Sequence, residues 1–134
     1  MTAALLDTNA VSDLMRDHPN VKARVGNHPD PVLTSAVVVG EIRYGLSRLP
    51  AGKKHNDLEA HAQSILAACR IDSITEPVAD AYGRLKASLE SQGLNLDDND
   101  LWIAATGLTN GYLVVTRDRI FTRISGLQVE DWSV

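Results

Sequence analysis

Short strand-like runs alternate along this chain with longer amphipathic stretches, and this alternation constrains the fold more than any other feature. The predicted strands lie at residues 3–6, 32–34, 71–74, 113–116 and 127–130. Between them, apolar residues recur at helical spacing, as in the stripe Val38, Ile42, Leu46 and Leu49. The alternation is typical of βα units and predicts an α/β fold.

The amphipathic stretches predict six helices. They are one from Thr8 that His18-Pro19 ends, one at 21–25, one that Ser35 caps, one at 57–69, one from Thr75 to Gly93 and one at about 100–110. Ser and Thr are preferred immediately before a helix because their side-chain oxygens accept a hydrogen bond from its first N–H groups. With 134 residues, the chain is expected to form a single domain over residues 1–134.

The charge balance does not suggest a simple nucleic-acid-binding surface. The chain has 13 basic and 17 acidic residues, so its net charge is 13 − 17 = −4, whereas nucleic-acid-binding domains usually have a basic surplus. Metal ions held by several of the acids would reverse the local sign where a phosphate approaches. An acidic surface would also suit a cationic protein partner.

Other chemistries find little support in the sequence. The single cysteine, Cys69, is expected to be a buried core thiol, and the four histidines have no zinc-ligand spacing. No phosphate-binding loop of the GxxxxGK[ST] kind occurs. Neither a membrane-spanning stretch nor a signal peptide is visible, so a cytoplasmic location is expected.

Four carboxylates stand at matched points of the predicted fold. Asp7 and Asp118 follow the strands at 3–6 and 113–116, Asp100 opens the last helix, and Glu41 lies early in the helix after the second strand. In an open parallel sheet, strand C-termini and helix N-termini meet at one edge, where ligands bind. Acids that converge there repel one another unless a cation lies between them, and a hard divalent cation prefers oxygen ligands.

Each acid also has a structural interpretation. Asp7 is a good N-cap, Glu41 falls on a helix side that solvent could cover, Asp100 suits a helix N-terminus, and Asp118 suits a turn. The neighbouring acids Asp97 and Asp98 make a purely structural role for Asp100 less favourable, because three acids in four residues repel. Either neighbour could also assist or replace Asp100.

Taken in order, these motifs resemble the PIN-domain ribonucleases, and most closely the VapC-type toxins of bacterial toxin–antitoxin pairs. The segments that carry the resemblance are Leu5-Leu6-Asp7-Thr8-Asn9, Val39-Gly40-Glu41-Ile42-Arg43-Tyr44-Gly45, Asn99-Asp100-Leu101-Trp102-Ile103-Ala104-Ala105 and Val114-Val115-Thr116-Arg117-Asp118, with Phe121 and residues 124–127 and 130–132 after them. They span essentially the whole chain. One position differs, since Ile120 stands where the family often has a further acid.

The resemblance implies a three-layer α/β/α PIN-like fold with a mostly parallel central sheet of about four to five strands. It also implies Mg²⁺- or Mn²⁺-dependent cleavage of RNA, a homodimer, and a VapB-like antitoxin whose tail blocks the active site. An acidic pocket of this kind should attract an arginine from that tail. The apolar residues Val37, Val38 and Val39 extend beyond a single helical stripe, which is consistent with a subunit interface.

The resemblance assigns roles to individual residues. Asp7, Glu41 and Asp100 would hold Mg²⁺ directly or through its waters, and Asp118 would support a second ion or orient the attacking water. Candidate assisting residues are Asn9, Thr116, Asp97 and Asp98, and candidate phosphate contacts are Arg43 and Arg117.

Two other functions remain open at this level. A phosphatase with an aspartyl nucleophile would also place Asp7 after the first strand, but such enzymes commonly have a second Asp two residues later, where this chain has Asn9. A catalytically idle PIN-like module that only binds a partner is the other alternative. The presence of all four acids argues against it.

Overall fold

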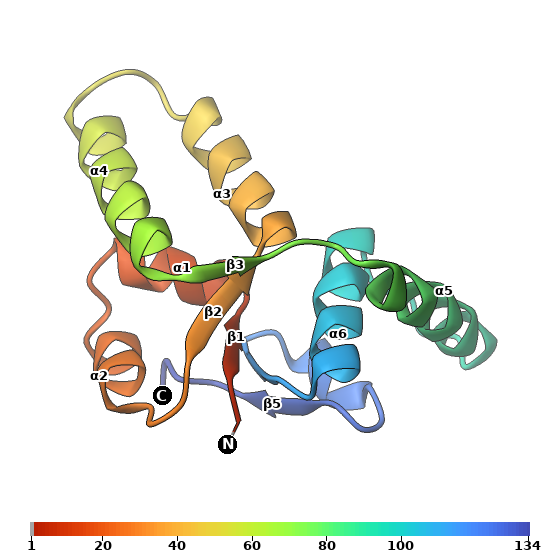
Figure 1. Cartoon of the computed structure of the whole chain (residues 1–134). Coiled ribbons are helices and arrows are strands. Elements are labelled where there is room, and N and C mark those ends of the chain that lie inside the picture. The colour runs from red at the N-terminus through yellow and green to blue at the C-terminus, as the bar shows by residue number, and fades with distance from the viewer. Residues whose placement is uncertain (1) are drawn as a thin grey trace.

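The computed structural model describes residues 2–134, and its centre is a five-stranded sheet in which every pair of neighbours is parallel (Figure 1). The strand order is β3-β2-β1-β4-β5. The strands are β1 (Ala4–Leu6), β2 (Val32–Ser35), β3 (Arg70–Asp72), β4 (Leu113–Val115) and β5 (Gln128–Glu130). The helices are α1 (Thr8–Met15), α2 (Pro19–Asn27), α3 (Ala36–Arg48), α4 (Lys53–Ala68), α5 (Glu76–Ser91) and α6 (Asp98–Asn110), with a short 3-10 helix η1 (Arg119–Arg123).

The helices form two layers around the sheet. Helix α1 packs against α2, α3 and α4, whereas α5 packs mainly against α6. Figure 1 shows α5 and α6 on the side of the sheet opposite α1, α2 and α4. The central strand β1 is buried along its whole length, as an interior parallel strand should be. The predicted three-layer α/β/α fold with a mostly parallel sheet is therefore confirmed, and the sheet is wholly parallel.

Several boundaries differ from the sequence-based prediction, among them those of α2, which extends two residues further at each end. Helix α4 starts at Lys53, because the turn before it ends at Gly52, whose φ of 151° favours glycine. Helix α6 starts at Asp98, two residues early, because the side chain of Asp97 caps it. The edge strand β3 is Arg70–Asp72, since its register is set by pairing with β2.

Close packing holds α6 against the sheet. A side chain at Gly107 would place its Cβ 2.8 Å from Val114 Cγ2 and 2.9 Å from Leu127 Cδ1, so any larger residue would force these side chains to shift. Leu101 and Ile103 anchor the same helix in the core. The N-terminal end of α6 is thereby fixed relative to the strand ends.

The sheet register brings the ends of β1 and β4 together. Leu6 lies opposite Val115, and the Asp7 N–H donates to the Val115 carbonyl over 3.0 Å. On the other side of β1, the Thr34 hydroxyl donates to the Leu6 carbonyl over 2.8 Å. The residues that follow these strands therefore meet at one edge of the sheet, as predicted. No helix within residues 2–134 is long and apolar enough to cross a bilayer.

Candidate active site

Asp7 is a buried carboxylate whose two oxygens both accept hydrogen bonds. Its exposed fraction is 4%. Oδ1 accepts from the Thr8 N–H over 2.7 Å, while Oδ2 accepts from the Thr116 hydroxyl over 2.8 Å and from Asn9 Nδ2 over 3.3 Å. Asp7 thus caps α1, as its structural interpretation predicted, and still lies at the sheet edge. Burial raises its pKa, Thr116 and Thr8 lower it, and the charges of Glu41 and Asp118 raise it.

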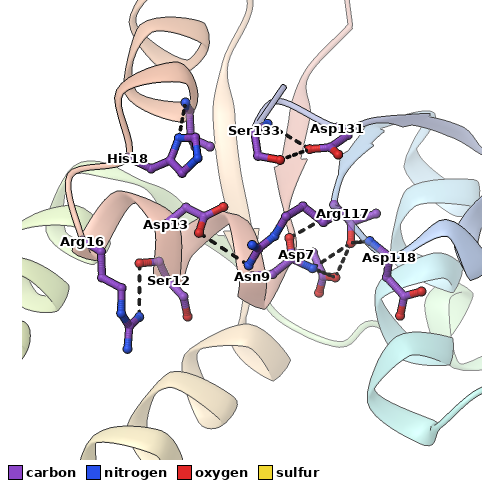
Figure 2. Close-up of polar contacts among 12 residues, drawn as sticks. Asp7, Asn9, Ser12, Asp13, Arg16, His18, Arg117, Asp118, Asp131 and Ser133 are labelled. Atoms are coloured by element: carbon purple, nitrogen blue, oxygen red, sulfur yellow. Dashed lines mark hydrogen bonds and ion pairs between the residues drawn. The ribbon is translucent and has the colours of Figure 1, made fainter.

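Thr116 and Asn9 tie the end of β4 to the start of α1. Thr116 Oγ1 donates to Asp7 and accepts from Asn9 Nδ2 over 2.9 Å and from the Asp118 N–H over 3.0 Å. Asn9 Oδ1 accepts from the Arg117 N–H over 3.1 Å. Figure 2 shows Asp7, Asn9 and Asp118 gathered at this point. Thr116, a candidate assisting residue, thus bonds both the Asp7 carboxylate and the backbone of Asp118.

Asp118 follows β4 and caps the 3-10 helix η1. Its Oδ1 accepts from the Ile120 N–H over 3.0 Å, while its own N–H is held by Thr116. The Asp118 carboxylate therefore both caps a helix and is a candidate metal ligand, as the Asp7 carboxylate is. Its charge contributes to the raised pKa of both Asp7 and Asp100.

Sequence reasoning missed Asp13, a nearly buried acid behind the site. It is 8% exposed, and its Oδ1 lies 3.5 Å from the Arg117 guanidinium, while its buried Oδ2 has no hydrogen-bond partner among the described residues. Figure 2 shows the Arg117 side chain reaching back towards α1 to meet it. The only sequence signal was an acid inside the helical pattern that starts at Thr8, and such acids are usually solvated.

Glu41 reaches the same edge from α3. Its Oε1 accepts from the Thr8 hydroxyl over 2.7 Å, and its side chain is half-buried. The N-terminus of α3 is fixed by Ser35, whose Oγ accepts from the Val38 N–H over 3.3 Å. Thr8 was predicted only as a helix cap, but it links Glu41 to the start of α1.

Asp100 has the most perturbed carboxyl group in the site. Burial, followed by the negative charges of Asp7, Asp97, Asp118 and Glu41 in that order, raises its pKa to about 7. All four predicted acids are therefore close enough to act on one another electrostatically. A pKa this high for a carboxyl group, caused by burial and like charge, is typical of functional sites.

The structure also separates Asp100 from its two acidic neighbours. Asp98 Oδ1 accepts from the Tyr82 hydroxyl over 2.7 Å and from Lys86 Nζ over 3.2 Å, and these contacts lower the pKa of Asp98. Asp97 Oδ1 accepts from the Asn99 N–H over 2.9 Å at the helix start. Asp98 is thus directed away, Asp97 caps the helix beside the site, and Asp100 is the acid that faces the other three.

Both arginines that were candidate phosphate contacts are paired with carboxylates. Arg43 lies 2.7 Å from Glu59 on α4, and Arg117 lies 3.5 Å from Asp13. Phosphate contact by either guanidinium would require it to leave this partner or to bind at its free edge.

The donors fit a divalent cation that keeps part of its water shell. Within residues 2–134, no three or more His, Cys, Asp or Glu side chains lie close enough to enclose an ion by themselves. After burial, the negative charges of Asp7, Asp97, Asp118 and Glu41 nevertheless contribute to the raised pKa of Asp100. The two findings agree if mutual repulsion spreads the carboxylates and water completes the coordination, because Mg²⁺ commonly takes only one or two protein carboxylates.

Known structures share this architecture. The crystal structure of FitAcB from Neisseria gonorrhoeae aligns with a TM-score of 0.83 at 34% identity, covering 96% of each chain. The crystal structure of VapBC2 from Rickettsia felis, bound to a DNA fragment from its promoter, aligns with a TM-score of 0.84 at 27% identity, covering 98% of this chain and 99% of that chain.

Sequence relatives cover nearly the same length. Toxin FitB of Neisseria gonorrhoeae is 38% identical over 85% of this chain and 86% of that protein. VapC ribonuclease Y4jK of Sinorhizobium fredii is 31% identical over 93% and 94%, respectively. The PIN domain family matches residues 4–127, which hold all four acids. The fold, the placement of the acids and these matches together show that the chain belongs to the PIN-domain family.

Proposed function

We propose that this protein is a metal-dependent endoribonuclease that acts as the toxin of a type II toxin–antitoxin pair. The observation that carries the proposal is the convergence of Asp7, Glu41, Asp100 and Asp118 at one edge of the sheet, where burial and the neighbouring negative charges together raise the pKa of Asp100 to about 7. Relatives named as ribonucleases and toxins support the same activity. The substrate is RNA in the cytoplasm, and the cofactor is Mg²⁺ or Mn²⁺.

The residues divide the work of phosphodiester hydrolysis. Asp7, Glu41 and Asp100 would hold the cation, directly or through water, and the bound cation lowers the pKa of a coordinated water and offsets the charge of the phosphate. Asp7 is held in place by the hydroxyl of Thr116 and the amide of Asn9. Asp118 lies beside these groups and orients the attacking water through its carboxylate.

The partner is a VapB-like antitoxin. The structural neighbours include the VapBC2 complex of Rickettsia felis and the FitAB complex, both bound to DNA. We propose that the antitoxin tail places an arginine among the four acids, where its guanidinium would offset the carboxylate charge in place of the cation. The toxin is also proposed to form a homodimer, although Val38 is taken up by the core and Val37 and Val39 are half-buried.

Cleavage of a structured RNA by the antitoxin-free protein tests the proposal. We expect cleavage with Mg²⁺ or Mn²⁺, none with a chelator, and none with Asp100→Asn. Asp98→Asn is the matched control, because Asp98 has the same charge but faces Tyr82 and Lys86. Equal losses in both variants, or cleavage that survives Asp100→Asn, would refute the assignment.

The alternatives predict other outcomes in the same assay. A phosphatase would release phosphate from a monoester such as p-nitrophenyl phosphate and leave internal RNA linkages intact. An idle binding module would bind the antitoxin without cleaving either substrate.

A further inference from the structure

An open groove lies beside the acids, between α3 and α6. Its volume is about 610 Å³, which exceeds that of a single nucleobase. Tyr44 and Trp102 provide its aromatic surface, and Ala36 and Gly40 lie with Tyr44 along α3 at intervals of four residues. A Cβ at Gly40 would meet nothing within 4 Å, so the surface of α3 leaves space between the small residues and the tyrosine.

The two aromatic residues are presented differently. Tyr44 is 64% exposed, and the Arg48 guanidinium lies 5.2 Å from the centre of its ring. Trp102 stacks on Tyr82 with ring centroids 3.8 Å apart and an interplanar angle of 11°. The Tyr82 hydroxyl is in turn bonded to Asp98. Trp102 is thus held in orientation by a neighbour, whereas Tyr44 is a large exposed ring with no packing partner of that kind.

The groove is continuous with the candidate active site. Thr8 and Glu41 line it, and they are joined by the 2.7 Å hydrogen bond that positions Glu41. Asn99, the residue before Asp100, lines it as well. The lining residues, all in the described part of the chain, include one carboxylate and no lysine or arginine. Such a surface disfavours a phosphate and suits an uncharged planar group.

We propose that this groove is a nucleobase subsite, which holds one unstacked base of the RNA next to the phosphodiester that is cleaved. The base would stack on Tyr44 and lie against Trp102, and the Asn99 amide would meet polar atoms on its edge. The proposal rests on the proposed ribonuclease function, because the adjacent acids determine where the cleaved phosphate lies. Bases unstacked from single-stranded RNA are commonly held by stacking on aromatic side chains.

Cleavage kinetics on single-stranded RNA, with and without an abasic ribose on either side of the cleaved bond, test the subsite. Stacking of one base accounts for about 5- to 150-fold in affinity. We expect Tyr44→Ala to lower kcat/KM on intact RNA within that range, and Tyr44→Phe, which keeps the ring, to stay within about twofold of wild type. On RNA that lacks the base at the correct position, wild type and Tyr44→Ala should be equal, because the contact is already absent.

A control variant and a binding measurement sharpen the test. Ile71→Ala removes an exposed apolar side chain on β3, outside the groove, and should leave the kinetics unchanged. RNA should also quench the fluorescence of Trp102 in the presence of a chelator, and Trp102→Phe should abolish this change, since Trp132 is 1% exposed. Quenching by RNA together with no cleavage when Mg²⁺ or Mn²⁺ is supplied would keep the subsite and reject the ribonuclease function.

Other results would overturn the subsite. If Tyr44→Ala cleaves intact RNA as well as wild type does, the base is not held there. If the same variant dissociates a dimer in sedimentation, the groove is covered by a second copy of the chain. If it weakens only antitoxin binding, the groove belongs to the antitoxin. Losses that multiply when Tyr44→Ala is combined with the abasic RNA would place the base elsewhere.

Discussion

Asp7 and Asp100 face the same site but are held in opposite ways. Asp7 sits at the end of the central strand, with both oxygens bonded to Thr8, Asn9 and Thr116. Asp100 sits in the first turn of α6 and makes no side-chain hydrogen bond within the described residues. The pKa of Asp100 reaches about 7 because nothing in the protein offsets its burial and the surrounding charge. Asp7 therefore has a structural role besides its proposed role in the site, whereas Asp100 has no side-chain hydrogen bond of its own within residues 2–134.

The largest expected effect of Asn substitution is on RNA cleavage, and the two acids should differ in what the same substitution does to the stability of the fold. Asp100→Asn and Asp7→Asn should both reduce RNA cleavage by orders of magnitude, because each removes a candidate cation ligand. Only Asp100→Asn should leave the fold fully stable. RNA cleavage followed by gel electrophoresis, together with thermal melts of the same samples, checks this. Normal cleavage by either variant would contradict the assignment of that acid.

The next largest effect is on the stability of the metal-free protein, where Asp7→Asn and Asp100→Asn should act in opposite directions. Asp7 accepts bonds at both oxygens, and Thr116 Oγ1 already accepts two, so the NH₂ of an asparagine at position 7 would face another donor. We expect Asp7→Asn to cost about 1–3 kcal/mol of unfolding free energy. Asp100→Asn should instead stabilise the protein, because it removes like-charge repulsion. Urea unfolding measures both, and equal effects would remove the distinction.

The dependence of stability on pH follows from the raised pKa of Asp100. Its folded-state pKa of about 7 lies above the ordinary value of 3.8, so the folded protein binds more protons than the unfolded chain between those values. Unfolding free energy should therefore fall as pH rises from about 4 to 7, by about 1–2 kcal/mol once solvent screening of this half-exposed group is allowed for. Urea unfolding at pH 5 and pH 8 without metal would show it.

Two controls isolate the Asp100 contribution. Asp100→Asn should flatten this pH dependence, leaving only the smaller contribution from Asp7. Added Mg²⁺ should stabilise wild type more at pH 8 than at pH 5, because the ion binds the ionised form. A wild-type protein that gains stability as pH rises without metal would contradict the raised pKa.

The smallest effect is expected behind the site, at Asp13. Asp13→Asn removes the charge that holds Arg117, so stability should change by less than about 1 kcal/mol, given the half-exposed arginine. Cleavage should fall a few-fold, because the backbone of Arg117 links Asn9 to the segment that carries Asp118. Asp17→Asn, at an exposed acid paired with Lys22, is the control. Unchanged cleavage with Asp13→Asn would mean that Asp13 does not help to position the site, and that Asp7, Asn9 and Thr116 suffice.

Periodicity and helix caps were enough to predict the fold class and the sheet edge at which the acids lie. Apolar runs followed by Asp7 and Thr116-Arg117-Asp118 fix two parallel strand ends, because periodicity and caps are local properties of the chain. The sequence also contained the ordered motifs of the PIN family. It left open which of Asp97, Asp98 and Asp100 faces the site, because all three can open a helix.

Contacts between elements far apart in the sequence distinguish these three acids and make Asp7 and Asp100 unequal. Tyr82 and Lys86 on α5 turn Asp98 away, and no local pattern encodes a contact between two helices. The hydrogen bond from Thr116 to Asp7 joins residues 109 positions apart, and it arises from the parallel register of β1 and β4. The pKa of Asp100 is likewise collective, because it depends on burial and on four charges brought together from separate elements of the fold.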